Sequence, residues 1–311
     1  IISERLHIPA SQVDATLDLL AAGCTIPFIS RYRKEATGNL DEVQIAAISD
    51  LNERLSELQK RKETILKTID AQGKLTDELQ RRITTSWDAT EIEDLYMPYK
   101  PRRRTRAQVA REQGLEPLAT LLLLQREQSP STAARRFINA DVPDVAAALQ
   151  GAQDIIAENI SEDERSRQTV RRAFSREAVI SARVIEKMRH EDSAQKFADY
   201  FSFSEELRRC SSHRLLAMRR GEEEGILRVG ITIDDEPCIE RLQRQHVRGN
   251  GPCQKLVSEA VDDAYKRLLR PSIENEFAAQ MDTTAKKLEQ AQIAIGNLVK
   301  EIGAQLLPVV A

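Results

Sequence analysis

The chain has 311 residues and a net charge of -3, and 41% of its residues are hydrophobic, 31% charged and only 4% aromatic. These values are typical of a charge-rich, helix-prone protein of two or three domains, and they exclude binding of nucleic acid through overall charge, so such binding would need local patches. No apolar run approaches the roughly 20 residues that span a bilayer and no signal peptide opens the chain, so we expect an intracellular protein without membrane contact.

The cysteines and the chain ends add two expectations. Four cysteines, Cys24, Cys210, Cys238 and Cys253, form no C-x-x-C pair, which favours structural thiols in a reducing compartment. Ile1 is not methionine, and the last residues end without a helix stop. We therefore expect this sequence to be a piece of a longer protein.

The first predicted elements form a helix-turn-helix-like start. A helix carrying Val13 and Leu17 ends at Gly23, and Pro27 suits the first turn of a second helix from Ile26 to Ala36. This hairpin is a weak signal for DNA binding, because the same arrangement is ordinary packing in all-α proteins.

The second predicted helix carries cations and aromatic side chains. Arg31, Arg33 and Lys34 are candidate phosphate contacts, although Arg31 can instead pair with Glu35 one turn away, and we favour that structural role. The spacing of Phe28, Ile29 and Tyr32 is helical, so we expect them in the core and not in a base-stacking surface.

A long amphipathic helix should follow, from Asp41 to Gly73, with apolar residues at intervals of three and four that only Lys62 interrupts. It would be on the order of 45 Å long and would act as a spine for other elements.

The densest charge of one sign lies in the basic strap, which we define as Lys100–Arg106. Pro98 and Pro101 predict an extended connector from Tyr96 to Pro101 between two helices. Thr90 with Glu93 indicates a capping box for the helix before it, and Thr105 with Gln108 indicates another for the helix after it. The strap's candidate phosphate contacts are Lys100, Arg102, Arg103, Arg104 and Arg106.

The start of a helix is already positive, so cations crowded there favour an anionic partner such as a phosphate. The alternative is that Glu91, Glu93 and Asp94 neutralise the strap within the chain. The residues alone leave both interpretations open.

The C-terminal part mixes strands and helices. Ala178–Ile185 is β-prone, and Gly225–Ile233 is the best strand candidate, with a turn at residues 234–237. Pro271 should separate a helix at Lys255–Leu269 from a second long helix at about Ser272–Leu306.

The composition predicts no catalytic or metal site. Cys210, His213, Cys238, His246 and Cys253 permit a zinc site on paper, but their spacing matches no compact finger. The Glu222–Glu224 run is too crude a match for metal-assisted hydrolysis. We expect no metal, no cofactor and no enzymatic activity.

Three stretches together resemble the N-terminal region of the bacterial Tex family of transcription accessory proteins. They are IPFISRYRKEATGNLDEVQ at Ile26–Gln44, EIEDLYMPYKPRRRTRAQVAREQGLEPLA at Glu91–Ala119 and SSHRLLAMRRGEEEGIL at Ser211–Leu227. The resemblance implies a mainly helical region that precedes a ribonuclease-H-like domain, a helix-hairpin-helix module and an S1 domain. It also implies nucleic-acid binding and a role in transcription, and no catalytic residue of the family carries over to this chain.

We therefore expect a mainly α, elongated multi-helix assembly with the helix-turn-helix-like start, one long spine helix and a minor β-hairpin near residues 225–240. Residues 1–210 would form the Tex N-terminal-type region, and residues 211–311 a connecting helical region with the small β element. The expected function is that of a scaffold, monomeric and in the bacterial cytoplasm, that binds RNA or DNA phosphates with little sequence selectivity. The alternative is a protein-interaction scaffold that docks on other domains of the protein or on the transcription machinery.

Overall fold

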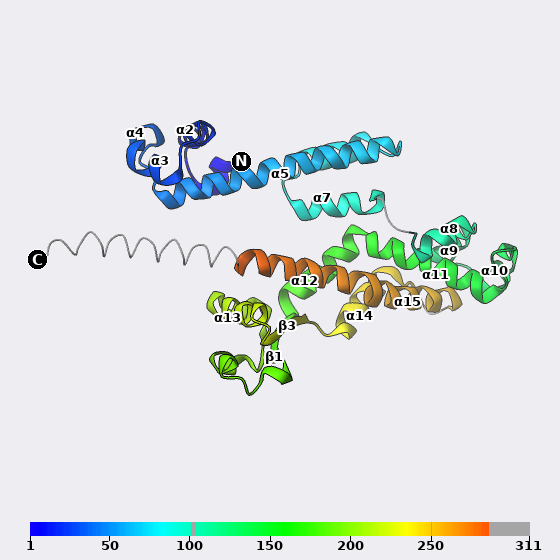
Figure 1. Cartoon of the computed structure of the whole chain (residues 1–311). Helices are drawn as coiled ribbons and strands as arrows, with labels where there is room; N and C mark the ends of the chain where they lie inside the picture. Colours follow the sequence, from blue (N-terminus) through cyan, green and yellow to red (C-terminus); the bar gives the residue numbers. More distant parts are fainter. Residues whose placement is uncertain (101–103, 250, 286–311) are drawn as a thin grey trace, which may run out of the picture. The chain divides into compact units, whose positions relative to one another are not determined.

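The computed structural model describes residues 1–100, 104–249 and 251–285, and the chain divides into two compact units, Ile1–Pro101 and Arg102–Ala311 (Figure 1). Both units are built mainly of helices, which confirms the predicted fold class. The expected division at residue 210 falls inside the second unit, between strands of one sheet. As a statement about the domains of a longer protein, that division stays a prediction.

Unit 1 is all helical. Its elements are α1 (Ile2–Leu6), α2 (Ala10–Ala21), α3 (Ile26–Tyr32), α4 (Lys34–Thr37), α5 (Glu42–Ala71), α6 (Asp77–Thr85), α7 (Ala89–Tyr96) and the 3-10 turn η1 (Met97–Tyr99). The predicted second helix at Ile26–Ala36 is in fact broken at Arg33 into α3 and α4.

The predicted spine helix is confirmed as α5, which has 30 residues. It begins with a capping box, in which the Asp41 carboxylate accepts from Gln44 N at 2.7 Å and the Gln44 amide oxygen accepts from Asp41 N at 3.1 Å. Its first half packs Ile45 and Ile48 against α1, α2 and α3, and its second half packs Ile65 against α6 and α7. One helix thus supports two hydrophobic clusters.

Lys62 interrupts the apolar stripe of α5 but is fully inside the unit. Only 1% of the residue is exposed, and its ammonium group donates to the carbonyl oxygen of Thr84 at 2.9 Å, in the last turn of α6. The same group lies over the Trp87 ring. The buried charge therefore has a carbonyl and an aromatic face as partners.

The described part of unit 2 combines helices with one small sheet. Its elements are α8 (Arg106–Glu112), α9 (Glu116–Leu124), α10 (Pro130–Ala134), η2 (Arg135–Phe137), α11 (Val145–Glu162), α12 (Glu164–Glu177), β1 (Val179–Val184), η3 (Glu186–Met188), η4 (Asp192–Tyr200), β2 (Ser202–Glu206), η5 (Leu207–Arg209), α13 (Ser212–Glu223), β3 (Leu227–Thr232), α14 (Asp235–His246), α15 (Pro252–Asp263) and η6 (Ala264–Leu269).

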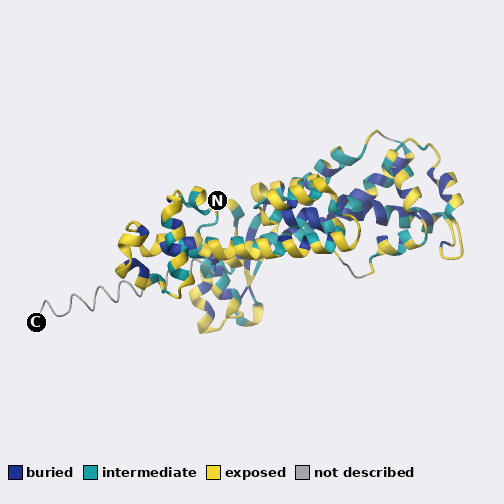
Figure 2. Cartoon of the chain, turned by 90° about the horizontal axis from the view of Figure 1, so that it is seen from above, coloured by how far each residue is buried: buried dark blue, intermediate teal, exposed yellow. Residues whose placement is uncertain are grey.

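Helix α11 is the centre of unit 2. It packs against α8, α9, α12 and α15, and it buries Ile155 and Ile156 completely. Its Gly151 permits a close approach, because a Cβ there would lie 2.4 Å from Cδ1 of the buried Leu115. In Figure 2 the buried positions lie on the sides of the helices that face their neighbours, as amphipathic packing requires.

The β element is a three-stranded antiparallel sheet with the order β2-β1-β3. The strands predicted at Ala178–Ile185 and Gly225–Ile233 are confirmed, but the hairpin expected near residues 225–240 is wrong. Asp234 does not turn the chain into a second strand, because its carboxylate accepts from Glu236 N at 3.2 Å and caps α14. Strand β3 pairs instead with β1, more than forty positions earlier in the chain.

The predicted helix break at Pro271 is also wrong. The chain is helical without interruption across residues 252–285, and the six residues of η6 form a π-helical segment just before the proline. Proline cannot donate to the carbonyl of residue i-4 and its ring crowds that group. The wider π-helical turn provides room for it, so the helix continues.

Candidate nucleic-acid interface

Helix α3 is positioned by its ends and by its buried side. Thr25 is extended before it, Pro27 lies in its first turn, and after the break at Arg33 the following α4 ends at Gly38 with φ +65°. Ile29 is fully buried against the first half of α5, and Ser30 points to the same side. The opposite side of α3 is left facing solvent.

Two aromatic side chains lie on that solvent side. Phe28 is 39% exposed and Tyr32 is 69% exposed, and their ring centroids are 5.4 Å apart. The prediction that both belong to the core with Ile29 is wrong. Their spacing is helical, as predicted, but only Ile29 lies on the part of the arc that meets α5, and the other two rings pack on each other one turn apart.

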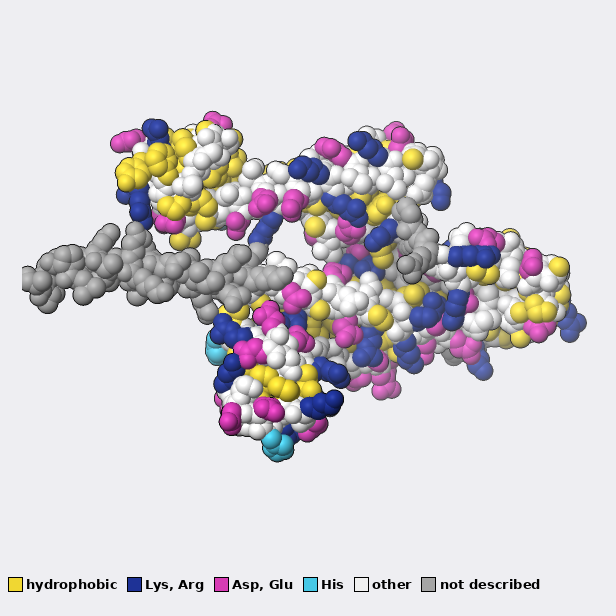
Figure 3. Space-filling model, viewed as in Figure 1, with side chains coloured by type: hydrophobic (Ala, Val, Ile, Leu, Met, Phe, Trp, Pro, Cys, Tyr) yellow, Lys and Arg dark blue, Asp and Glu magenta, His cyan; other side chains and the backbone are white. Residues whose placement is uncertain are grey.

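The predicted contacts of this region, Arg31, Arg33 and Lys34, are all exposed. The Arg33 guanidinium lies 5.9 Å from the centroid of the Phe28 ring, while Arg31 is already engaged within the protein. Figure 3 shows hydrophobic side chains exposed over α3 and α4, with basic side chains beside them. We call Phe28, Tyr32, Arg33 and Lys34 the aromatic-basic surface.

The segment leading into the basic strap is helical for longer than predicted. Asp88, not Thr90, caps α7, with its carboxylate accepting from Thr90 N at 2.8 Å. Tyr96 ends α7, and η1 adds a 3-10 turn before Lys100, so the extended connector expected from Tyr96 is wrong at its start. A proline is tolerated in the first turn of a helix, which explains Pro98.

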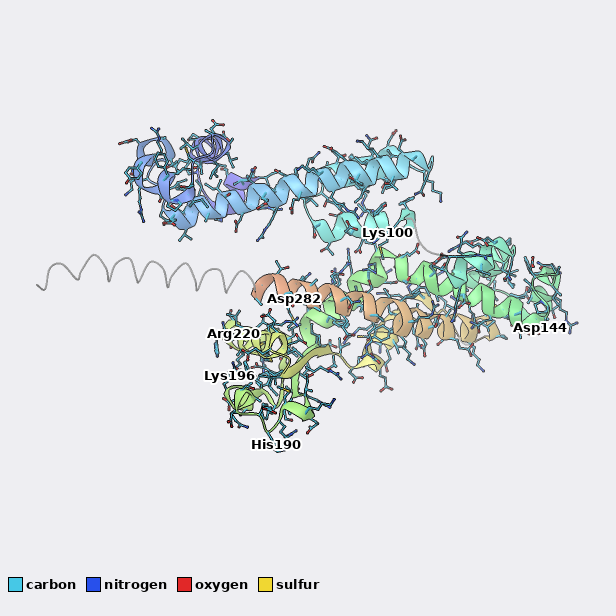
Figure 4. All side chains as sticks on the ribbon, in the orientation of Figure 1. Lys100, Asp144, His190, Lys196, Arg220 and Asp282 are labelled. Atoms are coloured by element: carbon cyan, nitrogen blue, oxygen red, sulfur yellow. The ribbon has the colours of Figure 1, made fainter. Side chains whose placement is uncertain are left out.

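Two of the three acids expected to neutralise the strap, Glu91 and Glu93, have partners elsewhere in unit 1. Arg61 donates to both carboxylate oxygens of Glu93 at 2.6 and 3.0 Å, and Glu91 accepts from the Ser86 hydroxyl at 2.6 Å. Asp94 is buried and already engaged within the protein. Lys100 is exposed at the end of unit 1 (Figure 4).

Two strap arginines nevertheless have intramolecular partners in unit 2. Arg104 donates to Glu112 at 2.6 Å, and the Arg106 guanidinium lies 3.3 Å from the carboxylate of Asp154, whose side chain is only 10% exposed. Only one half of the capping box predicted between them is present: Gln108 N donates to the Thr105 hydroxyl at 3.0 Å, whereas the Gln108 side chain donates to Glu112. Arg102 and Arg103 lie outside the described residues.

A polar chain that sequence reasoning missed joins α12 to α14. The Ser166 hydroxyl lies 2.8 Å from the Asp163 carboxylate and 2.7 Å from Nε2 of His246. Burial lowers the pKa of His246 below its ordinary value, against the opposing effect of Asp163. The serine stands between acid and histidine, whereas a hydrolytic triad needs the histidine between them. The 80 residues that separate Ser166 from His246 gave no sequence signal.

The cysteines and histidines considered as a zinc site are not gathered into one. Within the described parts of the chain, no three residues of the types His, Cys, Asp and Glu are arranged to hold a metal ion. Cys238 and Cys253 are buried, and burial raises the pKa of both thiols. Their role in this structure is packing.

No helix in the described residues is both long enough and apolar enough to cross a membrane. Acidic and basic side chains are interspersed over the face seen in Figure 3. A phosphate-binding surface would therefore be a local feature such as the aromatic-basic surface. The expectation of a monomer in the bacterial cytoplasm stays a prediction.

Comparison with known proteins decides the family. The model described as Tex central region-like matches residues 125–291, more than half of the chain, and the model described as Tex-like protein N-terminal domain matches residues 1–70. The chain belongs to the Tex family. This confirms the resemblance that the three sequence stretches indicated.

The similar proteins include members from distant organisms. The chain is 42% identical to "Transcriptional accessory protein Tex" of Neisseria gonorrhoeae over 79% of its length and 33% of that protein. It is 38% identical to "Protein tex" of Bordetella pertussis over 96% of its length and 39% of that protein. It is 29% identical to "S1 RNA-binding domain-containing protein 1" of Homo sapiens over 92% of its length and 30% of that protein. The chain thus spans about a third of the length of these relatives.

Proposed function

We propose that this Tex-family region is a non-enzymatic helical scaffold that contacts nucleic acid through phosphates and exposed aromatic rings, as part of a transcription accessory protein. The observation that supports this proposal most directly is the aromatic-basic surface on α3 and α4. Two solvent-facing rings, 5.4 Å apart, have a guanidinium over one of them and an exposed lysine next in sequence. This combination suits a single strand, because a base of any identity can stack on an exposed ring and cations contact the backbone phosphates.

The partner class is supported by the family. One relative is named as a transcriptional accessory protein and another as an S1 RNA-binding domain protein. Since contacts to phosphates and ring faces carry no base code, we expect weak sequence selectivity for RNA or single-stranded DNA.

The basic strap has a secondary part in this proposal. Lys100, Arg102 and Arg103 are proposed as phosphate contacts on the basis of the sequence alone. At Arg104 and Arg106 a phosphate would compete with the present partners, Glu112 and Asp154. A surface charge pair is worth little, so Arg104 can exchange more readily than Arg106, whose partner is buried.

The second candidate function is a protein-interaction scaffold. The observation that favours it is the neutralisation of Arg104 and Arg106 within unit 2, which leaves less positive charge on the strap than its sequence suggests. In that case the exposed Tyr32 ring would dock on a protein, either another domain of the longer chain or a component of the transcription machinery.

The test is fluorescence anisotropy with a labelled single-stranded RNA of about 16 nucleotides across a salt series. We expect Arg33→Ala/Lys34→Ala to weaken binding and to make the slope of log K against log salt shallower, by about 0.7 for each phosphate that the variant no longer neutralises. The matched control is Lys60→Ala/Lys67→Ala, which removes the same charge from exposed positions of α5. Equal salt slopes in the two double variants would contradict the proposal and favour the protein scaffold.

A further inference from the structure

The sheet of unit 2 has one face in the core and one face in solvent. Ile180, Ala182 and Ile231 are buried, with Phe197 of η4 and Met218 of α13 in the same cluster. Alternate residues point the other way. We call these the outer face, and its members are Val179, Ser181, Arg183, Ser202, Ser204, Glu206, Arg228, Gly230 and Thr232.

Two arginines of the outer face are directly opposite each other. Arg183 on β1 pairs in register with Arg228 on β3, and its other neighbour is Ser202 on β2. Both arginines are exposed, and neither has an ion pair or a hydrogen bond from its guanidinium among the described residues. Like charges placed directly opposite across a strand pair are destabilising. An anion bound between them would remove that repulsion.

Two half-buried arginines near this sheet are paired. Arg214 donates to Glu205 at 2.7 Å and Arg241 donates to Glu177 at 2.7 Å. The chain therefore supplies carboxylates to nearby arginines and, within its described residues, supplies none to Arg183 and Arg228. The outer face therefore carries two positive charges without a carboxylate partner among the described residues.

Gly230 adds an independent observation at the middle of the outer face. Its backbone is not in the left-handed region, and a Cβ built on it would meet none of the described residues within 4 Å. Neither the backbone conformation nor packing against the described part of the chain requires glycine there, although glycine weakens a strand. A glycine in an open strand position permits close approach of another molecule's backbone.

The neighbours of Gly230 are small and polar. Ser181 lies beside it on β1, followed by Ser204 on β2, and these hydroxyls can donate to phosphate oxygens. The acid at the far end, Glu206, is countered by Arg208 at 2.9 Å and by Arg209 at 3.2 Å. None of the nine outer-face residues is aromatic, so this face has no ring on which a base could stack.

We propose that the outer face of the β2-β1-β3 sheet binds the phosphodiester backbone of nucleic acid. Arg183 and Arg228 contact one phosphate or two successive ones. The nucleic-acid strand then passes over Ser181, Ser204 and Gly230. Arginine suits this role because its planar group donates two parallel hydrogen bonds to a phosphate. The site is in unit 2 and does not rest on the aromatic-basic surface of unit 1.

The test uses the 311-residue chain in a Phe28→Ala/Tyr32→Ala background, so that failure of the surface on α3 does not decide the result. The probes are a labelled single-stranded RNA and a labelled duplex DNA of equal length. Arg183→Ala/Arg228→Ala is expected to make the salt slope for the single strand shallower by about 0.7 if the arginines share one phosphate and by about 1.4 if they contact two. The matched control, Arg135→Ala/Arg136→Ala, removes two exposed arginines from η2 and should leave the slope unchanged.

A second variant tests whether binding can be blocked without destabilising the protein. Gly230→Val adds a β-branched side chain that suits a strand, so the melting temperature should be retained or raised while nucleic-acid binding falls. The proposal is overturned if the arginine variant matches its control, if Gly230→Val binds like the parent, or if the background protein binds neither probe. It is also overturned if polyglutamate displaces the labelled nucleic acid as well as unlabelled nucleic acid does, since the face would then bind acidic protein.

Discussion

The ammonium group of Lys62 lies 3.8 Å from the centroid of the Trp87 ring, and the same group donates to the Thr84 carbonyl. Removing this side chain deletes a desolvated cation-π contact and a charged hydrogen bond, and it opens a cavity. We predict that Lys62→Ala lowers the free energy of unfolding by about 2 to 4 kcal/mol. Urea titration followed by circular dichroism measures it. Lys67→Ala, on the exposed side of the same helix, is the control, and equal effects of the two would contradict the prediction.

Gly151 gives a second prediction, on the contact between α11 and Leu115. Replacing it with alanine gains about 1 kcal/mol of helix propensity. The new Cβ would, however, lie 2.4 Å from Cδ1 of Leu115, which is fully buried, so a shift of that side chain would disturb its neighbours. We predict that the cost of this steric strain exceeds the gain in helix propensity, so that Gly151→Ala lowers the melting temperature. The double variant Gly151→Ala/Leu115→Ala should recover part of the loss relative to Leu115→Ala alone, and no recovery would show that the clash is not the cause.

The two paired arginines of the strap should behave differently. Arg106→Ala leaves the buried Asp154 with Arg267 at 3.7 Å as its remaining cation, so we predict a loss of about 1 to 2 kcal/mol. Arg104→Ala breaks a pair with an exposed glutamate and should have little measurable effect on stability. Thermal unfolding of the two single variants gives the comparison. The reverse order of stability would mean that the Asp154 contact does not form.

His246 predicts a pH dependence of stability. Its pKa is lowered by burial in the folded state, so between that value and the unfolded value of about 6.5 the unfolded chain binds a proton that the folded chain does not. The free energy of unfolding should therefore fall as the pH drops below about 6.5. Melting temperatures from about pH 7.5 to about pH 5 should fall less in His246→Gln, which keeps an N-H donor near Ser166 but does not titrate. Identical pH profiles would contradict the assignment.

Elements marked by strong local signals were predictable from the sequence. The spine helix follows from its apolar spacing and from Asp41 and Gln44 at its start, and strand β3 follows from the apolar run in Gly225–Ile233. The partner of β3 could not be predicted, because pairing with β1 depends on contacts distant in sequence. The continuation of the helix through Pro271 was not predictable either, since the π-helical turn that accommodates the proline has no simple sequence pattern.

The candidate site was predictable in its cations and not in its geometry. Arg33 and Lys34 were identified from charge alone, but the exposure of Phe28 and Tyr32 depends on how α3 lies on α5. The pairing of Arg106 with Asp154 joins two helices that are far apart in sequence. For Arg104 and Arg106 the partners are Glu112 and Asp154, and not the acids Glu91, Glu93 and Asp94 that the sequence offered.

The central claim is that the rings of α3 bind a nucleic-acid strand, and the most direct measurement is the affinity of Phe28→Ala/Tyr32→Ala for a labelled single-stranded RNA. Stacking on an aromatic ring is worth about 1 to 3 kcal/mol per base, so we predict at least about a tenfold loss of affinity with an unchanged salt slope. The control is Val43→Ala, which truncates another exposed apolar side chain of unit 1, 77% accessible. A double variant that binds RNA as tightly as this control would contradict the account.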